Sequence, residues 1–300
     1  MLEGQVVIVT GAGRGIGRDI ARMMAAQGGR VIVNDLGSSG SGEGADAAPA
    51  EEVVAEIKAA GGEAAANFGN VAKAADAKAM FEQAMDTFGR ADVVVNNAGI
   101  LRDTIFHRMT EEEWDAVIDV HLKGSFNMAH AVAAQFKAQS SGCFLNFTST
   151  SGLIGNFGQA NYSAAKMGIV GLSKSLALDM ARFNVRSNCI APFAWSRLIG
   201  TIKTDTEAEK ARVARIKEMT PDKIAPLCVA LAKPDSQVTG QIFCIRNNEI
   251  FLMSQPRPIR SVHRSEGWTP ETVLNHALPA LEAGFYPLDR SGEVFTWDPI

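Results

Sequence analysis

The chain has 300 residues, with 29 basic and 33 acidic side chains and a formal net charge of −4. This balance excludes the basic excess of a nucleic-acid-binding surface, and no apolar run approaches the ~20 residues that a membrane span needs. The length suits one α/β domain with an extension, which we place at residues 1–245 and 246–300.

The cysteines are scattered and form no Cys-x-x-Cys pair (Cys143, Cys189, Cys228 and Cys244). They indicate reduced, apolar side chains of an intracellular protein, and no metal site is expected. Met1 leads through a polar residue, Glu3, into an apolar stretch that begins at Val6, which leaves no room for a signal peptide. These features favour a cytoplasmic location.

Glycines follow the first expected strand at once. Val6–Thr10 is a short apolar run of the kind buried on both faces of a parallel sheet, and helical spacing follows over Ile16–Gln27. This order suits a dinucleotide, because glycines let the backbone approach a diphosphate and a helix N-terminus favours its charge. A Gly-rich turn without a ligand is the alternative. The candidate coenzyme-binding residues here are Gly11, Arg14, Gly15, Ile16 and Gly17.

The second expected strand, Val31–Asp35, ends in an acid. Asp35 lies 24 residues after Gly11, close to the offset of about 20 residues at which an acid bonds the adenosine ribose of a dinucleotide. A carboxylate there favours NAD, because it would repel the 2′-phosphate of NADP, whereas Arg14 would favour that phosphate unless it is a solvated loop residue. The Gly/Ser-rich segment Gly37–Pro49 is expected to be a flexible loop, either solvated or beside the adenosine.

Strands and helices continue to alternate. Further strands are expected at Ala64–Phe68, Val93–Asn96, Cys143–Thr148, Val185–Ile190 and Gln241–Ile245. Further helices are expected at Ala47–Ala60, Ala74–Phe88, Glu111–Gln139, Ala160–Arg182 and Pro221–Ala232. This alternation predicts a Rossmann-like, doubly wound parallel sheet of about seven strands with helices on both faces. Ligands bind such sheets at the carboxyl ends of the strands, where we find Gly11, Asp35, Asn97, Ser149 and Pro192.

Tyr162 and Lys166 lie four residues apart and share one face of an expected helix. A phenol is a weak acid, with an unperturbed pKa of about 10, and a nearby ammonium lowers that pKa. The pair therefore suits proton exchange with an alcohol or ketone oxygen, which Ser149, 13 residues before Tyr162, would hold. The alternatives are that Ser149 only caps a helix and that Lys166 lies on a solvated face.

Together these residues resemble the short-chain dehydrogenase/reductase family over about residues 4–245. The glycine loop Thr10–Gly17, the Asn-Asn-Ala-Gly stretch Asn96–Gly99 and the spacing of Ser149, Tyr162 and Lys166 carry the resemblance. It implies hydride transfer between a nicotinamide coenzyme and a CH–OH group, with these last three residues catalytic and Lys166 also bonding the nicotinamide ribose. The resemblance also implies further coenzyme-binding residues, namely Asn70, Val71, Asn97, Ala98, Gly99, Tyr162, Lys166 and Pro192.

Longer stretches resemble one subgroup, the (3R)-hydroxyacyl-CoA dehydrogenase part of peroxisomal multifunctional enzymes and its bacterial relatives. These stretches are Asn34–Gly37, Asn96–Asp103, Val120–Phe126 and Gly155–Lys166. The resemblance implies a CoA or steroid-CoA thioester as substrate. Two positions depart from the family pattern. His121 stands where the family has a catalytic Asn. The subgroup also tends to have His at this position, and we expect a supporting role for His121. Phe193 stands where the family has a Gly after the Pro.

The part after Ile245 gives the weakest signal. Thr269–Ala283 looks helical, with Thr269 as N-cap and Pro270 in the first turn. The basic run before it suits the phosphates of CoA, a solvated tail or a subunit contact (Arg257, Arg260, His263 and Arg264). Aromatic residues suggest that the tail docks on an apolar surface such as a partner subunit of a homodimer or homotetramer (Trp268, Phe285, Tyr286, Phe295 and Trp297).

The substrate side is predicted from fewer residues. Phe157, Phe193 and Trp195 would provide flat apolar walls for a steroid or a long acyl chain, or would only pack the loop over the nicotinamide. Two basic residues, Arg102 and Lys123, are expected near the mouth of the cleft, where they would meet the phosphates of CoA.

Four functions remain open from the sequence. The first is an NAD-dependent dehydrogenase of a 3-hydroxyacyl-CoA or related thioester, and the second is an NADPH-dependent reductase of an acyl-carrier-protein, steroid or small ketone substrate. The third is a nucleotide-binding regulator without catalysis, against which the intact Ser149, Tyr162 and Lys166 argue. The fourth is a structural scaffold, against which the glycine loop argues.

Overall fold

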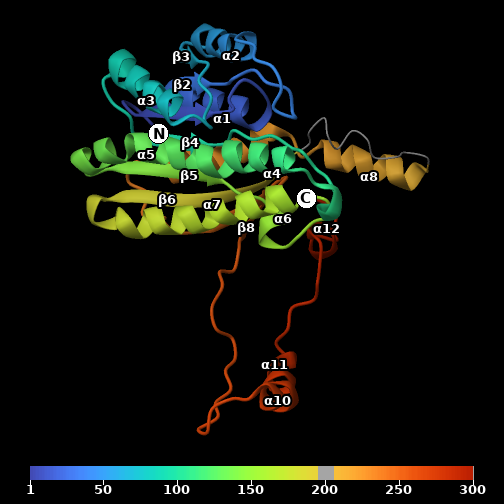
Figure 1. Cartoon of the computed structure of the whole chain (residues 1–300). Helices are drawn as coiled ribbons and strands as arrows, with labels where there is room; N and C mark the ends of the chain where they lie inside the picture. The colour runs from blue at the N-terminus through green and yellow to red at the C-terminus, as the bar shows by residue number, and fades with distance from the viewer. Residues whose placement is uncertain (195–205, 300) are drawn as a thin grey trace.

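The computed structural model describes residues 1–194 and 206–299. Its sheet has the strand order β3-β2-β1-β4-β5-β6-β7-β8, and the pairs are parallel except for β7 and β8. Helices cover both faces of the sheet (Figure 1). The predicted Rossmann-like fold is confirmed. The strands are β1 (Val6–Thr10), β2 (Arg30–Asn34), β3 (Glu63–Asn67), β4 (Val93–Asn96), β5 (Gly142–Phe147), β6 (Val185–Phe193), β7 (Ile242–Arg246) and β8 (Glu249–Leu252).

The eighth strand was not expected. It pairs antiparallel with β7 after a two-residue turn at Asn247 and Asn248, and Asn247 has a φ of 56°. Asn tolerates this left-handed conformation and favours such hairpin turns, so the Asn-Asn pair is the local signal for β8. The strand places part of the extension in the main sheet, while the division at residue 245 stays a prediction.

Alternate side chains of the strands build two apolar layers. Val7 and Val9 pack toward α1, α2 and α9, whereas Val6 and Ile8 pack toward α3 and α5; α7 covers the later strands through Ile169 and its neighbours. The helices of the body are α1 (Gly15–Ala26), α2 (Ala48–Ala59), α3 (Ala74–Phe88), α4 (Glu111–Ile118), α5 (Gly124–Gln139), α6 (Thr150–Leu153), α7 (Ala160–Asp179), α8 (Glu207–Lys217) and α9 (Ala225–Ala232).

The helix expected over Glu111–Gln139 is interrupted. A π-helical turn at Asp119–Lys123 separates α4 from α5, and such turns are frequent at functional sites. The sequence analysis also missed α6 and α8. In addition, β6 continues three residues beyond its expected end, to Phe193.

The segment after β2 is docked. Leu101 N donates to Gly40 O at 3.0 Å, and Arg102 Nε donates to Ser41 O at 2.9 Å. Gly42, with a φ of +90°, lies against Ile100. The chain after β4 thus supplies hydrogen-bond partners for this segment that no local pattern shows, while its flexibility stays a prediction.

Residues 256–289, which we call the arm, leave the body of the molecule and return to it (Figure 1). The arm contains α10 (Pro270–Thr272) and α11 (Leu278–Glu282), joined by a π-helical turn, and Thr269 caps α10 as predicted. Just beyond the arm, α12 (Ser291–Val294) lies on the body again. None of the described helices is both long and apolar enough to cross a membrane.

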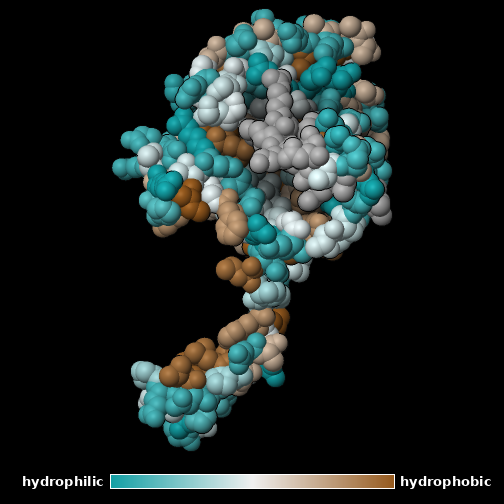
Figure 2. Space-filling view, turned by 90° about the vertical axis from the view of Figure 1, so that its right-hand side faces the viewer, coloured by the Kyte–Doolittle hydropathy of each residue, from teal (hydrophilic) through white to brown (hydrophobic). Residues whose placement is uncertain are grey.

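The arm is rich in exposed apolar side chains, which appear brown on its surface in Figure 2. At its start, Gln255 Nε2 donates to Gly240 O at 2.7 Å, and at its end Ser291 N donates to Gly155 O at 3.0 Å. Both ends are thus held on the body. The exposed apolar residues between them are Ile259, Trp268, Leu274, Leu278, Phe285, Tyr286 and Leu288.

Candidate active site

The glycine loop after β1 is locked onto the segment after β4. A Cβ atom on Gly17 would lie 2.2 Å from Gly11 O, and one on Gly11 would lie 2.8 Å from Ala98 Cα. Asn97 Nδ2 donates to the carbonyls of Thr10 and Gly11 at 3.0 Å each. Gly11 also has a φ of +63°, which favours glycine. The turn is therefore shaped by contacts within the protein.

The N-terminus of α1 suits an anion. Its N-cap residue, Arg14, makes no capping bond with its side chain, and the first turn contains no acidic residue. Gly15 stands in open space, since a Cβ there would meet nothing within 4 Å. The first N–H groups of a helix lack helical partners and carry partial positive charge. Together with Ile16 and Gly17, these residues fit the diphosphate of a dinucleotide.

Asp35 follows β2 and faces the glycine loop. Its Oδ2 accepts from Gly13 N at 2.8 Å, and its Oδ1 accepts from Gly37 N at 2.7 Å. A carboxylate offers about four acceptor positions, so the two N–H groups leave capacity for ribose hydroxyls. The position suits the adenosine ribose of a dinucleotide, while the choice of NAD stays a prediction.

The turn after β3 uses its own polar groups. Asn70 Oδ1 accepts from Ala72 N at 2.9 Å, and Val71 O accepts from Asn127 Nδ2 of α5 at 2.8 Å. The sequence analysis did not single out Asn127. Its buried amide holds the carbonyl of Val71, a predicted coenzyme-binding residue, from helix α5.

Ser149 caps a helix and lies beside Tyr162. It is the N-cap of α6, with Oγ accepting from Ser151 N at 3.1 Å, and its side chain lies close enough to Tyr162 of α7 to influence the phenol. The capping interpretation therefore does not exclude the catalytic one. Burial raises the pKa of Tyr162, the neighbouring Ser149 side chain acts in the opposite direction, and the charge of Asp103 adds to the rise.

Lys166 is buried, with 4% of its surface exposed, which excludes the solvated helix face. Its Nζ donates to Phe147 O at 2.7 Å and lies 5.5 Å from the centre of the Tyr162 ring. Burial lowers the pKa of Lys166 to about 7, while Cys189 acts in the opposite direction. The pKa of Tyr162 is not lowered as expected from Lys166, because burial of the phenol dominates.

His121 is buried beside Tyr162. The two rings meet edge to face with centroids 5.2 Å apart. Nε2 of His121 lies 3.1 Å from Ile100 N and 2.8 Å from Ile100 O, and Nδ1 has no partner in the described part of the chain. Burial lowers its pKa to about 3; the charge of Lys166 acts in the same direction and the bond to Ile100 against it. The imidazole is therefore neutral near pH 7.

The imidazole also explains a glycine. A Cβ atom on Gly99 would lie 2.3 Å from His121 Cε1. Gly99 is part of the predicted coenzyme-binding stretch, and its lack of a side chain is required by the ring behind it. The π-helical turn that carries His121 places the ring in this space.

Two positioning residues were missed by the sequence analysis. Asn161 is fully buried; its Oδ1 accepts from Tyr162 N at 2.7 Å and its Nδ2 donates to the carbonyls of Arg102 and Glu113 at 3.0 Å. Thr10 Oγ1 accepts from the N–H groups of Asn97 and Ala98, at 3.1 Å each. The only sequence signal for either residue is its place beside a predicted site residue.

On the substrate side, Phe157 is exposed in the loop before α7, and Phe193 packs edge to face on Phe295 at 5.0 Å. Trp195 lies outside the described residues. Pro192 pairs with Ile245 near the end of β6. Both basic residues expected at the cleft mouth have partners, because Arg102 bonds Ser41 O, as described above, and Lys123 pairs with Asp119 at 3.3 Å.

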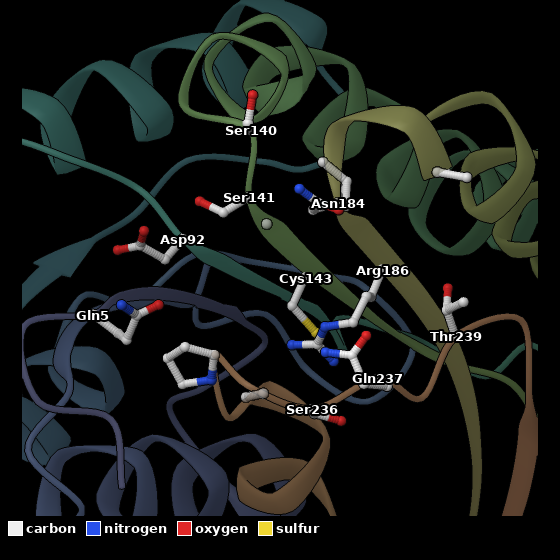
Figure 3. A pocket seen from close by; sticks show the side chains of 15 residues that line it. Gln5, Asp92, Ser140, Ser141, Cys143, Asn184, Arg186, Ser236, Gln237 and Thr239 are labelled. Carbon is white, nitrogen blue, oxygen red and sulfur yellow. The ribbon is translucent and has the colours of Figure 1, made fainter.

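A separate cavity of about 440 Å³ lies near the amino ends of β4, β5 and β6, at the opposite edge of the sheet (Figure 3). Arg186 lines it, but its guanidinium already donates to the carbonyls of Leu231 and Lys233. None of the predicted site residues lines this cavity. Within the described residues, no group of three His, Cys, Asp or Glu side chains is arranged to hold a metal ion.

Comparison with known proteins supports the family resemblance. The family model of short chain dehydrogenases matches residues 5–212. A short-chain type dehydrogenase/reductase of Mycobacterium tuberculosis is 42% identical over 83% of this chain and 84% of its own. Peroxisomal multifunctional enzyme type 2 of Mus musculus is 42% identical over 91% of this chain but only 36% of its own length. A 3-oxoacyl-[acyl-carrier-protein] reductase of Staphylococcus epidermidis is 41% identical over 78% of this chain and 94% of its own.

Solved structures agree with the fold. A short chain dehydrogenase from Mycobacterium avium superposes with a TM-score of 0.84 and 38% identity, covering 97% of this chain and 99% of its own. A 7α-hydroxysteroid dehydrogenase, solved with NADH and 7-oxo glycochenodeoxycholic acid, has a TM-score of 0.73 and 28% identity over 82% of this chain and 94% of its own.

Proposed function

We propose a substrate and a coenzyme for this chain, which belongs to the short-chain dehydrogenase/reductase family of oxidoreductases acting on CH–OH groups. The substrate is a hydroxyacyl-CoA or steroid-CoA type thioester, which the enzyme oxidises or reduces at the 3-position. The coenzyme is NAD. The observation that carries the proposal is the buried Lys166, whose Nζ lies 5.5 Å from the centre of the Tyr162 ring, with the side chain of Ser149 close to the same phenol. These side chains lie at the edge of the sheet where the glycine loop and Asp35 provide a fit for a dinucleotide.

The proton chemistry falls to Tyr162. In the reductive direction its hydroxyl gives a proton to the carbonyl oxygen, and in the oxidative direction the phenolate takes the proton of the alcohol. Ser149 holds the same oxygen through its hydroxyl. Lys166, 5.5 Å from the ring centre, stabilises the phenolate by its charge. The bound nicotinamide supplies or accepts the hydride.

NAD is proposed as coenzyme because of Asp35. Its carboxylate faces the glycine loop and is fixed by two backbone N–H groups, so a 2′-phosphate on the ribose would meet a negative charge. The structure of the 7α-hydroxysteroid dehydrogenase contains NADH, which supports the same choice. Arg14 is exposed at the N-cap of α1 and is the residue that would favour NADP.

The thioester is proposed from the relatives. The dehydrogenase-like match to peroxisomal multifunctional enzyme type 2 covers most of this chain, and the stretches that carry it surround His121 and Tyr162. The comparable match to an acyl-carrier-protein reductase keeps an NADPH-dependent ketoreductase as the second candidate. A regulator without catalysis is disfavoured, because a solvated nucleotide-binding surface gives no reason to bury Lys166.

The test is a coenzyme-coupled assay of the purified chain. We expect the highest kcat/KM with a 3-hydroxyacyl-CoA and NAD⁺, and a loss of about tenfold or more when the CoA is truncated to pantetheine or removed. Equal rates with the truncated thioester would favour the small-ketone candidate instead. A preference for NADP⁺ would contradict the role assigned to Asp35. A cytoplasmic location and a homodimer or homotetramer stay predictions.

A further inference from the structure

We propose that residues 290–298, which we call the clasp, are positioning residues for the substrate side of the site. The inference rests on the proposed function only in taking Ser149 and Tyr162 as the catalytic pair. The clasp contacts the loop Ile154–Gly158, which links the two helices that carry this pair, and it also contacts the end of β6 and helix α8. Each contact comes from a different residue of the clasp.

The first contact holds the loop between the two catalytic side chains. This loop joins α6, which Ser149 caps, to α7, which carries Tyr162. The main chain and hydroxyl of Ser291 both donate to Gly155 O, at 3.0 and 3.2 Å. The guanidinium of Arg290 lies 5.0 Å from the centre of the Phe157 ring. A movement of the clasp would therefore move the loop.

The second contact braces the end of β6. Phe193, which stands where the family pattern has Gly after Pro, meets Phe295 edge to face at 5.0 Å. Phe295 in turn packs on Phe251 of β8 at 5.4 Å and on Trp297 at 5.6 Å. A Gly at position 193 would offer no side chain for Phe295 to pack against. The rings of Phe193 and Phe295 therefore form one packed unit.

The clasp is anchored by charged groups on the β7–β8 hairpin. Arg246 is 7% exposed, pairs with Glu249 at 3.3 Å and donates to Trp297 O. Glu249 also accepts from Trp297 Nε1 at 2.8 Å. A buried guanidinium that lost these partners would be costly, so the hairpin fixes Trp297 and thereby Phe295.

The third contact reaches α8. Asp298 forms an ion pair with Arg215 near the end of that helix. The clasp thus joins elements from three distant parts of the chain. Among the described residues, the contacts of the clasp named above do not involve the glycine loop, Asp35 or the Asn97 segment. This separation predicts an effect on substrate binding that spares coenzyme binding.

The experiment compares Phe295→Ala with Phe295→Leu and with Tyr286→Ala, which removes an aromatic ring that is 83% exposed on the arm. For Phe295→Ala we expect the KM of the alcohol substrate to rise about fivefold or more, with a smaller change in kcat. The dissociation constant of NAD⁺, measured by calorimetry, should stay unchanged. Phe295→Leu should restore most of the KM, and Tyr286→Ala should match the wild type.

A second measurement does not depend on activity. Amide hydrogen exchange over residues 154–159 should be faster in Phe295→Ala than in the wild type or Tyr286→Ala, because the loop loses its support. Unchanged KM and unchanged exchange in Phe295→Ala would overturn the proposal, as would a parallel loss of NAD⁺ affinity. If the wild type oxidises another alcohol and no thioester, the proposed substrate is wrong. The role of the clasp is then tested separately, with that alcohol as substrate.

Discussion

The glycine loop on the coenzyme side and the loop Ile154–Gly158 on the substrate side are held by different parts of the chain. The glycine loop contacts Asp35, Asn97 and Ala98, all within the first hundred residues. The substrate-side loop is bonded at one end by Thr104 N, which donates to Gly158 O at 2.8 Å, and at the other by Ser291, which lies 136 residues after Gly155. The coenzyme side is a compact unit with a sequence motif, whereas the substrate side is completed by a distant tail without one.

This difference separates the two kinds of specificity. Contacts within the motif fix the backbone that would meet the coenzyme, so changes there should alter coenzyme binding or the chemical step. Contacts of the clasp are made through side chains outside the matched region 5–212, so they can vary without disturbing the motif. Four substitutions test how far the coenzyme side and the catalytic residues behave as a unit.

Tyr162→Phe should give the largest effect, because it removes the titratable hydroxyl and keeps the ring against His121. Turnover should fall by about 10²-fold or more, with the affinity for NAD⁺ nearly intact by calorimetry. Retention of more than about a tenth of the wild-type turnover would show that another group transfers the proton.

Gly17→Ala should disrupt the coenzyme side through the backbone. The added Cβ would lie 2.2 Å from Gly11 O, and such overpacking costs about 1–3 kcal/mol. Chemical denaturation should show this loss, together with weaker NAD⁺ binding. Gly171→Ala is the matched control, since its Cβ would meet nothing within 4 Å on α7 and should leave stability equal or higher. Normal NAD⁺ binding by Gly17→Ala would contradict the tight packing described here.

Asp35→Ser should change coenzyme choice rather than the chemical step. The substitution removes the negative charge and one partner of the Gly13 and Gly37 N–H groups, so the ratio of kcat/KM for NAD⁺ over NADP⁺ should fall by about tenfold. The ratio is obtained from steady-state kinetics with both coenzymes. An unchanged ratio would transfer control to Arg14.

His121→Asn should have the smallest effect on turnover at neutral pH, with a loss of less than about tenfold, because the imidazole is already neutral there. A loss as large as that of Tyr162→Phe would show that the ring carries the proton.

The same variant should show its effect in acid. The pKa of His121 is lowered from 6.5 to about 3 in the folded chain, so between these values the unfolded chain binds a proton that the folded chain does not. Stability is retained above about pH 6.5 and is lost as the pH falls toward about 3, by at most ~1.4 kcal/mol per pH unit from this group. The free energy of unfolding, measured by denaturation at several pH values, should fall less steeply toward acid pH in His121→Asn than in the wild type.

The predictability of the molecule follows the same division. The spacing of Ser149, Tyr162 and Lys166 and the glycines predicted which side chains meet, because each lies at a strand end or on a regular helix. The π-helical turn that contains His121 depends on contacts between helices, which no local pattern encodes. The same holds for the position of the imidazole, which leaves no room for a side chain at Gly99. The docking of residues 37–49 was missed for the same reason.

β8 and the clasp show another limit. The Asn247–Asn248 turn was a readable signal, and Phe295 indicated docking on an apolar surface, but no pattern in the sequence identifies its partner or singles out Ser291 and Asp298. Only the return of the chain brings them to Gly155, Phe193 and Arg215. Their role could be assigned only once both ends of the arm were placed.

Because the arm is attached to the body at Gln255 and at Ser291, it is a closed loop rather than a free tail. A single cut by a protease between residues 256 and 289 would break the polypeptide without releasing either fragment, since the clasp remains held by Gly155, Arg246 and Arg215. Denaturant would be needed to separate the two fragments of the nicked protein, and refolding the large one with synthetic peptides would then place any chosen side chain at 295.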